Sequence, residues 1–237
     1  MSILNIKNLT FSYKNKNSHN SIIENLSLEL NKNELISIVG ASGCGKSTLI
    51  KILAGIENEY SGEIFSSSKA YMPQKDILFP WRTILENILL PLEIKNSDLI
   101  QGKKLALNYL KQFQLDSYAY SYPQTLSGGM RQRVSFIRTL LTDAEILLLD
   151  EPFSALDAIT REDLQKWLLD KINLFNKSML FITHDIDEAL FLSDKILVCK
   201  NKPLTGFIEF KISKNYDAIK LSEIKKEILS VIKCDSL

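Results

Sequence analysis

The stretch from Gly40 to Thr48 limits the possible folds of this chain more than any other feature. It reads G-A-S-G-C-G-K-S-T and matches the phosphate-binding pattern G-x-x-x-x-G-K-[ST]. The apolar run Leu35–Val39 precedes it, and the helical stretch Leu49–Leu53 follows it. Glycines let the amides of such a loop turn toward one anion, and the helix N-terminus adds partial positive charge. The sequence therefore predicts a strand–loop–helix unit that binds a nucleoside triphosphate.

Every residue of this loop is a candidate contact for ATP: Gly40, Ala41, Ser42, Gly43, Cys44, Gly45, Lys46, Ser47 and Thr48. Lys46 is expected to reach the β- and γ-phosphates, and the hydroxyl of Ser47 is expected to ligate Mg²⁺. The thiol of Cys44 has two possible roles here. It is either a small inert filler or a reactive group whose pKa the helix-terminal amides lower.

Length and composition describe an ordinary globular protein. The chain has 237 residues, enough for one large domain, with 45% hydrophobic and 24% charged residues. A formal net charge of +1 gives no reason to expect nucleic acid as a partner. The longest apolar stretch, Ile84–Ile94, is interrupted by polar residues and is far shorter than the roughly 20 apolar residues of a membrane span. No signal peptide is expected ahead of the first strand, and three widely spaced cysteines suit a reducing cytosol.

The pattern of apolar residues predicts an α/β fold. Strands are expected at Ile3–Phe11, Ile22–Leu30, Leu35–Val39, Glu63–Phe65, Ala70–Met72, Ile146–Leu149, Met179–Thr183 and Lys195–Cys199, with a polar loop at Lys14–Asn20 between the first two. Helices are expected at Ser97–Phe113, Arg131–Leu141, Arg161–Phe175 and Leu221–Ile232, and Thr83 is expected to cap a further one. The last helix either packs on the body or binds a partner. We expect a P-loop NTPase core with a mostly parallel sheet, an antiparallel β subdomain and a helical insertion.

Two adjacent acids, Asp150 and Glu151, follow the apolar strand Ile146–Leu149. In a fold of this kind the end of that strand lies beside the phosphate loop. Asp150 is then expected to hold Mg²⁺ through water, and Glu151 to polarise the water that attacks the γ-phosphate. Alone the pair is a weak signal, but together with the phosphate loop it is a strong one.

The segment Leu126–Arg133 reads L-S-G-G-M-R-Q-R, and here the sequence resembles the nucleotide-binding subunits of ABC transporters, whose signature is L-S-G-G-Q. Ser127 is expected to cap a helix, and Gly128 and Gly129 allow its amides to approach a phosphate closely. The resemblance implies that Ser127, Gly128 and Gly129 meet the ATP bound by a second copy of the chain in a head-to-tail dimer. Met130 stands where the family more often has glutamine.

Other positions match the family in order along the chain. By this resemblance, Tyr13 is expected to stack on adenine, and Gln74 to contact Mg²⁺ and the attacking water while linking to the membrane partner. Asp157, in S-A-L-D, is expected to lie in a loop at the dimer interface. His184 is expected to contact the γ-phosphate and to orient Glu151, so that the catalytic set is Glu151, His184 and Gln74. The magnesium set is Ser47, Gln74 and Asp150.

The string L-F-P-W-R-T-I near residue 80, together with S-G-G-M-R-Q-R, resembles the nitrate/sulfonate/taurine importer branch, whose relatives also carry thiamine precursors. The implied function is ATP hydrolysis coupled to uptake of a small polar solute, with ATP and Mg²⁺ as cofactors. The implied partners are a second copy, a polytopic permease and, indirectly, an extracytoplasmic solute-binding protein, so the chain is expected on the cytoplasmic face of the cell membrane. Residues 1–237 are expected to form one domain, with a helical subdomain at about 75–140 and a C-terminal strand and helix at about 203–237.

Three other functions are compatible with parts of the sequence. An exporter or lipoprotein-releasing ATPase has nearly the same engine domain. A soluble ABC ATPase acting on DNA ends or ribosomes fits less well, because the chain lacks sustained heptads and has one phosphate loop. A P-loop kinase explains Gly40–Thr48 but leaves Leu126–Arg133 and His184 without a role.

Overall fold

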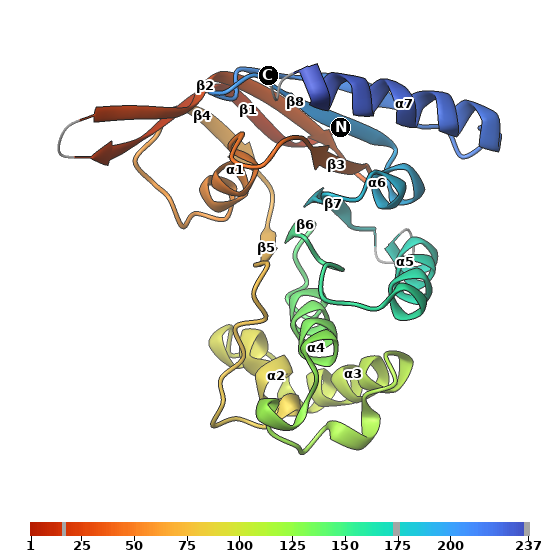
Figure 1. The fold of residues 1–237 in the computed structure, drawn as a ribbon. Coiled ribbons are helices and arrows are strands. Elements are labelled where there is room, and N and C mark those ends of the chain that lie inside the picture. The colour runs from red at the N-terminus through yellow and green to blue at the C-terminus, as the bar shows by residue number, and fades with distance from the viewer. Residues whose placement is uncertain (16–17, 173–175, 235–237) are drawn as a thin grey trace.

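A computed structural model describes residues 1–15, 18–172 and 176–234 (Figure 1). Its strands are β1 Ser2–Asn15, β2 Ser18–Asn31, β3 Leu35–Val39, β4 Ser61–Ser66, β5 Lys69–Met72, β6 Ile146–Asp150, β7 Ser178–Ile182, β8 Lys195–Lys200 and β9 Gly206–Lys211. Its α-helices are α1 Lys46–Leu53, α2 Ile84–Ile94, α3 Leu99–Gln112, α4 Gly128–Leu140, α5 Ala158–Ile172, α6 Ile186–Leu192 and α7 Ala218–Cys234. Two short 3₁₀ turns, Asp116–Tyr118 and Pro123–Thr125, lie between α3 and α4.

The central sheet has six strands in the order β5-β6-β7-β3-β8-β9. The first five are parallel, and only β9 pairs antiparallel, so the expected mostly parallel sheet is confirmed. All residues of β3, β6 and β7 are buried, which explains why their sequences are mostly apolar. Because these strands are parallel, their carboxyl ends meet at one edge of the sheet, where polar groups following each strand converge.

A second sheet, in the order β2-β1-β4, is antiparallel throughout (Figure 1). It confirms the expected antiparallel β subdomain. The expected loop at Lys14–Asn20 is wrong at both ends, because β1 continues to Asn15 and β2 begins at Ser18. Main-chain pairing of the two strands thus extends into polar sequence, and residues 16 and 17 lie outside the described part of the chain.

Helices α2, α3 and α4 lie together at the end of the molecule opposite the antiparallel sheet (Figure 1). Thr83 caps α2 as expected: its hydroxyl accepts from the amide of Glu86, whose carboxylate accepts from the amide of Thr83 at 2.7 Å. Helix α4 begins three residues earlier than expected, because Gly128 and Gly129 already belong to its first turn. Helix α5 ends at Ile172, and the last part of the helix expected at Arg161–Phe175 falls on residues that are not described.

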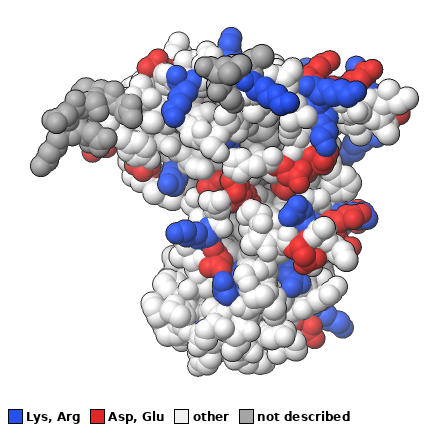
Figure 2. All heavy atoms as spheres, in the orientation of Figure 1, with Lys and Arg blue, Asp and Glu red and all other residues white. Residues whose placement is uncertain are grey.

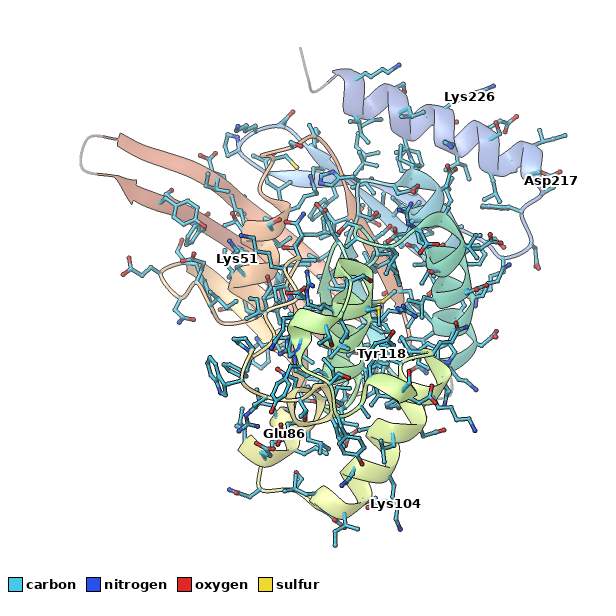
Figure 3. All side chains as sticks on the ribbon, turned by 60° about the horizontal axis from the view of Figure 1, so that its bottom comes forward. Lys51, Glu86, Lys104, Tyr118, Asp217 and Lys226 are labelled. Atoms are coloured by element: carbon cyan, nitrogen blue, oxygen red, sulfur yellow. The ribbon has the colours of Figure 1, made fainter. Side chains whose placement is uncertain are left out.

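The C-terminal helix α7 packs against the body. Ile224 and Ile228 are buried and belong to one apolar cluster with Val39 and Val198 of the central sheet. Lys226, on the other side of the helix, points away from the body (Figure 3). Of the two roles considered for this helix, the structure shows the packed one. No helix within the described ranges is long and apolar enough to span a bilayer.

Candidate functional site

The phosphate loop connects β3 to α1 at the carboxyl edge of the sheet. Gly40, Gly43 and Gly45 have φ values of 152°, 78° and 107°, a region that favours glycine. At Gly40 a side chain also lacks room, since a Cβ would lie 2.8 Å from the Cβ of Cys199. The glycine positions recognised in the sequence are therefore required by the backbone of this loop.

Lys46 is 5% exposed and points back into the loop that precedes it. Its Nζ donates to the carbonyls of Gly40 at 2.9 Å and Ala41 at 2.8 Å, and lies 3.6 Å from the sulfur of Cys44. These contacts satisfy a buried cation that would otherwise be costly. They also hold the positive charge at the loop, where an anion can attract it.

The surface beside the loop forms a small pocket of about 300 Å³. Residues of the loop, of the start of α1 and of two other segments line it. They are Ile22, Ser42, Gly43, Gly45, Lys46, Ser47, Thr48 and His184. The first turn of α1 carries no acidic residue, so its free amides and partial positive charge are open to an anion. The pocket is thus suited to phosphate groups.

Asp150 and Glu151 end β6 beside this pocket. Asp150 is buried, and the hydroxyl of Ser47 donates to its Oδ1 at 3.4 Å. Burial, reinforced by the charge of Glu151, raises the pKa of the Asp150 carboxyl above its usual value. A bound cation would relieve that cost, so the hydroxyl and carboxylate form a fitting oxygen pair for a divalent metal.

Two side chains from separate parts of the fold contact the carboxylate of Glu151. Gln74, just after β5, donates through Nε2 to Oε2 at 2.7 Å, and the Nε2 of His184 lies 2.5 Å from Oε1. Glu151 itself has a positive φ of 51°, and its main-chain amide donates to the carbonyl of Ile182 in β7 at 3.0 Å. The structure therefore brings Gln74, Glu151 and His184 together at the edge where Ser47 and Asp150 also lie.

Ser127 is the N-cap residue of α4, and Gly128 and Gly129 are the first two residues of this helix. The hydroxyl of Ser127 accepts from the amide of Met130 at 3.3 Å, which confirms the expected cap. Ser127 and Gly128 are exposed, while Gly129 packs so closely that a Cβ would lie 3.1 Å from the carbonyl oxygen of Ala155. The N-terminal end of α4 is therefore exposed to solvent at Ser127 and Gly128, while Gly129 packs against the segment that follows Glu151.

Gln132 is a residue that the sequence analysis overlooked. Its buried amide donates to the carbonyl of Glu151 at 3.0 Å and accepts from the amide of Ala155 at 2.9 Å. It thereby joins the start of α4 to the segment between Glu151 and Asp157. The clue in the sequence was a polar residue five positions after Ser127, on a helix with buried apolar neighbours.

Two predicted residues lie away from the cluster around Glu151. Tyr13, on β1, donates through its hydroxyl to Glu57 at 3.3 Å, and its ring packs edge-on against Phe11. Asp157 is exposed and caps α5 by accepting from the amide of Thr160 at 3.0 Å. Contacts of these two residues with a nucleotide or a second copy stay predictions.

A glycine loop at a helix start, with paired acids ending another parallel strand of the same sheet, defines the class of P-loop nucleotide-binding proteins. A family model described as ABC transporter matches residues 23–154, more than half of the 237 residues. The chain belongs to this family and is an ATPase of the ABC type. The resemblance drawn from the sequence motifs is thereby confirmed.

Two curated relatives are similar over most of their length. The formylaminopyrimidine import ATP-binding protein of Halalkalibacterium halodurans is 41% identical over 213 residues, which cover 89% of this chain and 84% of that protein. The aliphatic sulfonates import ATP-binding protein of Bacillus cereus is 41% identical over 223 residues, covering 88% and 87%. Among solved structures, a dimeric ATP-binding cassette in a post-hydrolysis state with ADP and Pi matches with a TM-score of 0.81 and 30% identity, over 89% of this chain and 99% of that one.

Cys44 provides a test of the charge at the phosphate loop. A hydrogen bond from Cys199, aided by the nearby charge of Lys46, lowers the pKa of the Cys44 thiol to about 6. We expect its alkylation by iodoacetamide to speed up between pH 5 and pH 7 and to level off above, because the thiolate is the reacting form. Bound ATP should slow the reaction, and alkylation should block hydrolysis.

The alkylation rate is followed by mass spectrometry of the peptide that contains Cys44, with Cys44→Ser as the control for hydrolysis. An ordinary thiol, with a pKa of about 8.5, would keep gaining reactivity up to pH 9. A rate that still rises steeply above pH 8 would contradict the lowered pKa. Insensitivity to the reagent at every pH would show that the thiol is an inert filler.

Glu188 of α6 is another residue that the sequence analysis overlooked, and its carboxyl titrates. It is 6% exposed, and its Oε1 has no hydrogen-bond partner among the described residues. Burial, with the charge of Asp185 adding to it, raises the pKa of this carboxyl to about 8. In the unfolded chain it would ionise at about pH 4.3. The folded state therefore binds more protons between these values, and its stability falls as pH rises through this window.

We expect Glu188→Gln to remove this pH dependence, because glutamine has no carboxyl to ionise. Between pH 5 and pH 8, the folded state with its Glu188 pKa of about 8 should lose about 3–4 kcal/mol of stability relative to the variant. At about 2–4 °C per kcal/mol in a domain of this size, the melting temperature of the wild type should fall by about 10 °C relative to the variant. Differential scanning fluorimetry at several pH values measures it. A gap between the two proteins that stays constant with pH would show that Glu188 is already ionised at pH 5.

Proposed function

We propose that the chain is the ATP-hydrolysing subunit of an importer for a small polar solute. The observation that carries this proposal is the convergence of Gln74, Glu151 and His184 beside the phosphate loop. The names of the two relatives add the direction of transport. ATP would bind along Gly40–Thr48, with Lys46 on its phosphates and Tyr13 on its adenine.

Ser47, Asp150 and Gln74 would hold Mg²⁺. When bound, this ion would neutralise part of the negative charge of the phosphates. The fit rests on oxygen donors and on the buried carboxylate of Asp150, whose pKa is raised by burial, so that a bound cation would stabilise its charged form. Mg²⁺ commonly uses one or two carboxylates together with substrate phosphates, so a larger cluster of acids is not needed. Within the described residues, no group of three or more His, Cys, Asp or Glu side chains is placed to hold a metal ion.

In the proposed reaction Glu151 accepts a proton from the water that attacks the γ-phosphate. His184 and Gln74 hold the two oxygens of its carboxylate, so the base is oriented before the nucleotide arrives. Reorganisation of this group is then small when the reaction occurs, which is how positioned polar groups accelerate such steps.

A second copy of the chain would complete each site, with Ser127, Gly128 and Gly129 facing the partner's ATP. Two facts support this arrangement: Ser127 and Gly128 are exposed in the single chain, and a similar cassette of known structure is a dimer. Asp157 would lie at the same interface, since it is exposed on the segment that contacts the start of α4.

The permease would dock beside α2 and α4, at the cytoplasmic face of the membrane. A groove of about 360 Å³ there is lined by Tyr71, Leu90, Pro91, Ile94, Lys95, Arg138, Thr139 and Thr142. Exposed apolar side chains lie on α2 and on the segment between Gln74 and α2: Ile94, Ile77 and Trp81 are 73%, 61% and 70% exposed. On the face shown in Figure 2, the surface over α2 at the lower left carries few charges.

Hydrogen bonds from the side chain of Arg138, which lines this groove, connect it to the segment that follows Gln74. Arg138 of α4 donates to the carbonyls of Ile77 at 2.8 Å and Asp76 at 3.2 Å, only a few residues after Gln74. If Gln74 moved when a nucleotide binds, Asp76 and Ile77, through their hydrogen bonds to Arg138, would transmit that movement to the groove. We propose one nucleotide-binding domain over residues 1–237, with this helical subdomain at about 75–140 and a C-terminal strand and helix at about 203–237.

Uptake assays test the proposed solute class. Cells that lack this chain should lose uptake of either an aliphatic sulfonate or a formylaminopyrimidine, the solutes in the names of the two relatives. The wild-type chain should restore that uptake, and Glu151→Gln, produced at the same level, should not. Unchanged uptake of both solutes in the deleted strain would contradict the proposed solute class.

A further inference from the structure

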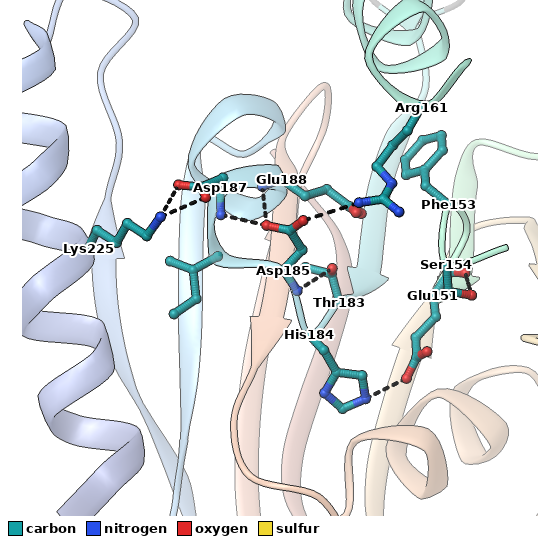
Figure 4. Close-up of a pocket in the computed structure, with 11 residues that line it drawn as sticks. Glu151, Phe153, Ser154, Arg161, Thr183, His184, Asp185, Asp187, Glu188 and Lys225 are labelled. Atoms are coloured by element: carbon teal, nitrogen blue, oxygen red, sulfur yellow. Dashed lines mark hydrogen bonds and ion pairs between the residues drawn. The ribbon is translucent and has the colours of Figure 1, made fainter. Parts of the chain in front are cut away.

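Arg161, in the first turn of α5, contacts two loops of the candidate site at once. Figure 4 shows one of these contacts, the ion pair with Asp185. Its guanidinium donates through one terminal nitrogen to the carbonyl oxygen of Leu156 at 2.9 Å. The other terminal nitrogen lies 3.5 Å from the Oδ2 of Asp185. Leu156 belongs to the segment 154–157, which we call the dimer loop, and Asp185 directly follows His184. One side chain thus links the dimer loop to the histidine that holds Glu151.

Asp185, through its hydrogen bonds, fixes the backbone conformation directly after His184. Its amide donates to the hydroxyl of Thr183 at 3.0 Å, and its Oδ1 accepts from the amides of Asp187 and Glu188, so it caps α6. These contacts use one carboxylate oxygen and leave Oδ2 to Arg161. Since the side chain of His184 is 50% exposed, its placement depends on its main-chain neighbours more than on packing around the ring.

The dimer loop is held on its other side by the start of α4. The amide of Ala155 donates to Gln132, and the side chain of Leu156 lies 3.2 Å from where a Cβ on Gly129 would be. Ser154 and Asp157, in contrast, are exposed. Pressure from a second copy on this exposed side would therefore displace the Leu156 carbonyl, to which Arg161 is bonded.

We propose that Arg161 is a positioning residue that fixes Asp185, and through it His184, relative to the dimer loop. The inference rests on the proposed function, because it assigns the dimer loop to the contact with a second copy. A half-exposed ion pair at 3.5 Å adds little to folding stability. The effect of losing Arg161 should therefore appear in hydrolysis and at His184 rather than in the stability of the fold.

The test compares Arg161→Gln with Arg161→Lys and with Lys166→Gln. Lys166 is an exposed cation on the same helix that pairs only with Glu162 in the described residues, so its loss controls for charge. We expect Arg161→Gln to lower kcat about tenfold with KM for ATP within about twofold, since transition-state positioning and not binding is lost. Arg161→Lys should recover most of that loss, and Lys166→Gln should leave kcat unchanged.

Nuclear magnetic resonance of the histidine side chains distinguishes a positioning role of Arg161 from a general effect on the fold. The chain has two histidines, His19 and His184, so histidine-selective labelling gives two assignable imidazole signals. We expect Arg161→Gln to shift the signal of His184 and not that of His19, with Lys166→Gln shifting neither. The melting temperature should stay within about 2 °C of the wild type, a shift that corresponds to under 1 kcal/mol in a chain of this length.

The outcomes separate this inference from the proposed function. If the wild type does not hydrolyse ATP, the proposed function fails and the inference with it. If the wild type is active, the inference is overturned when Arg161→Gln keeps kcat within twofold or leaves the His184 signal in place. It is equally overturned when activity is lost together with several degrees of melting temperature and lysine restores nothing.

Discussion

Glu151→Gln should trap the chain as an ATP-bound dimer. Glutamine has the same shape and can keep hydrogen bonds to Gln74 and His184, but it cannot accept the proton of the attacking water. A positioned general base is worth about 10²- to 10⁴-fold in rate, and we expect kcat to fall by that factor. Because ATP then persists, size-exclusion chromatography with light scattering should show a species of about twice the 27.0 kDa of one chain.

The matched control is Glu145→Gln. Glu145 lies just before β6, at the opposite end of the strand that carries Asp150 to the site, and its side chain is exposed. This variant should hydrolyse ATP as the wild type does and should show no trapped dimer. Full turnover by Glu151→Gln would mean that another group takes the proton and that our assignment of the base is wrong.

Lys46→Ala should abolish detectable nucleotide binding. In the structure the ammonium of Lys46 makes two hydrogen bonds to carbonyls of its own loop, and a triphosphate offers it stronger, charged acceptors. Hydrogen bonds to charged groups contribute about 1.5–3 kcal/mol each, so losing two of them weakens ATP affinity by about 10²- to 10⁴-fold. Isothermal titration calorimetry with ATP and Mg²⁺ measures the loss.

Lys32→Ala serves as the control, because Lys32 is an exposed lysine that precedes β3, whereas the phosphate loop follows the other end of that strand. It should bind ATP with unchanged affinity. Circular dichroism must show that Lys46→Ala keeps its fold, since the lysine also braces the loop. A folded Lys46→Ala protein with ATP affinity within threefold of the wild type would contradict the role of Lys46.

Much of the site could be predicted from the sequence because the motifs are local. The loop Gly40–Thr48 needs glycines where the backbone has positive φ, and such a pattern is visible in one dimension. The ends of β6 and β7 follow from their unbroken apolar runs, which place Asp150 and His184 at the same edge of a parallel sheet. Caps such as Thr83 and Ser127 are equally local, and both are confirmed.

The rest could not be predicted because it depends on contacts between distant segments. Arg161 stands on a helix among other polar residues, and nothing in its spacing marks it as a bridge between loops. The position of Gln132 after Ser127 hints at burial, but its partners on the segment after Glu151 follow only from the fold. The burial of Glu188 likewise depends on how α6 packs against the sheet. The length of the β1–β2 hairpin was misjudged for a related reason, since main-chain pairing tolerates the polar side chains that suggested a loop.

We propose that this chain is the ATPase of a membrane importer, and its partners in the cell test that function. The most direct measurement is to tag the chain, solubilise native membranes gently and identify co-purifying proteins by mass spectrometry. We predict a polytopic membrane protein, bound through the groove beside α2 and α4, together with an extracytoplasmic solute-binding protein. A membrane partner without any solute-binding protein would indicate an exporter or a lipoprotein-release system. Recovery from the soluble fraction alone, with ribosomes, DNA or nothing attached, would contradict the transport function.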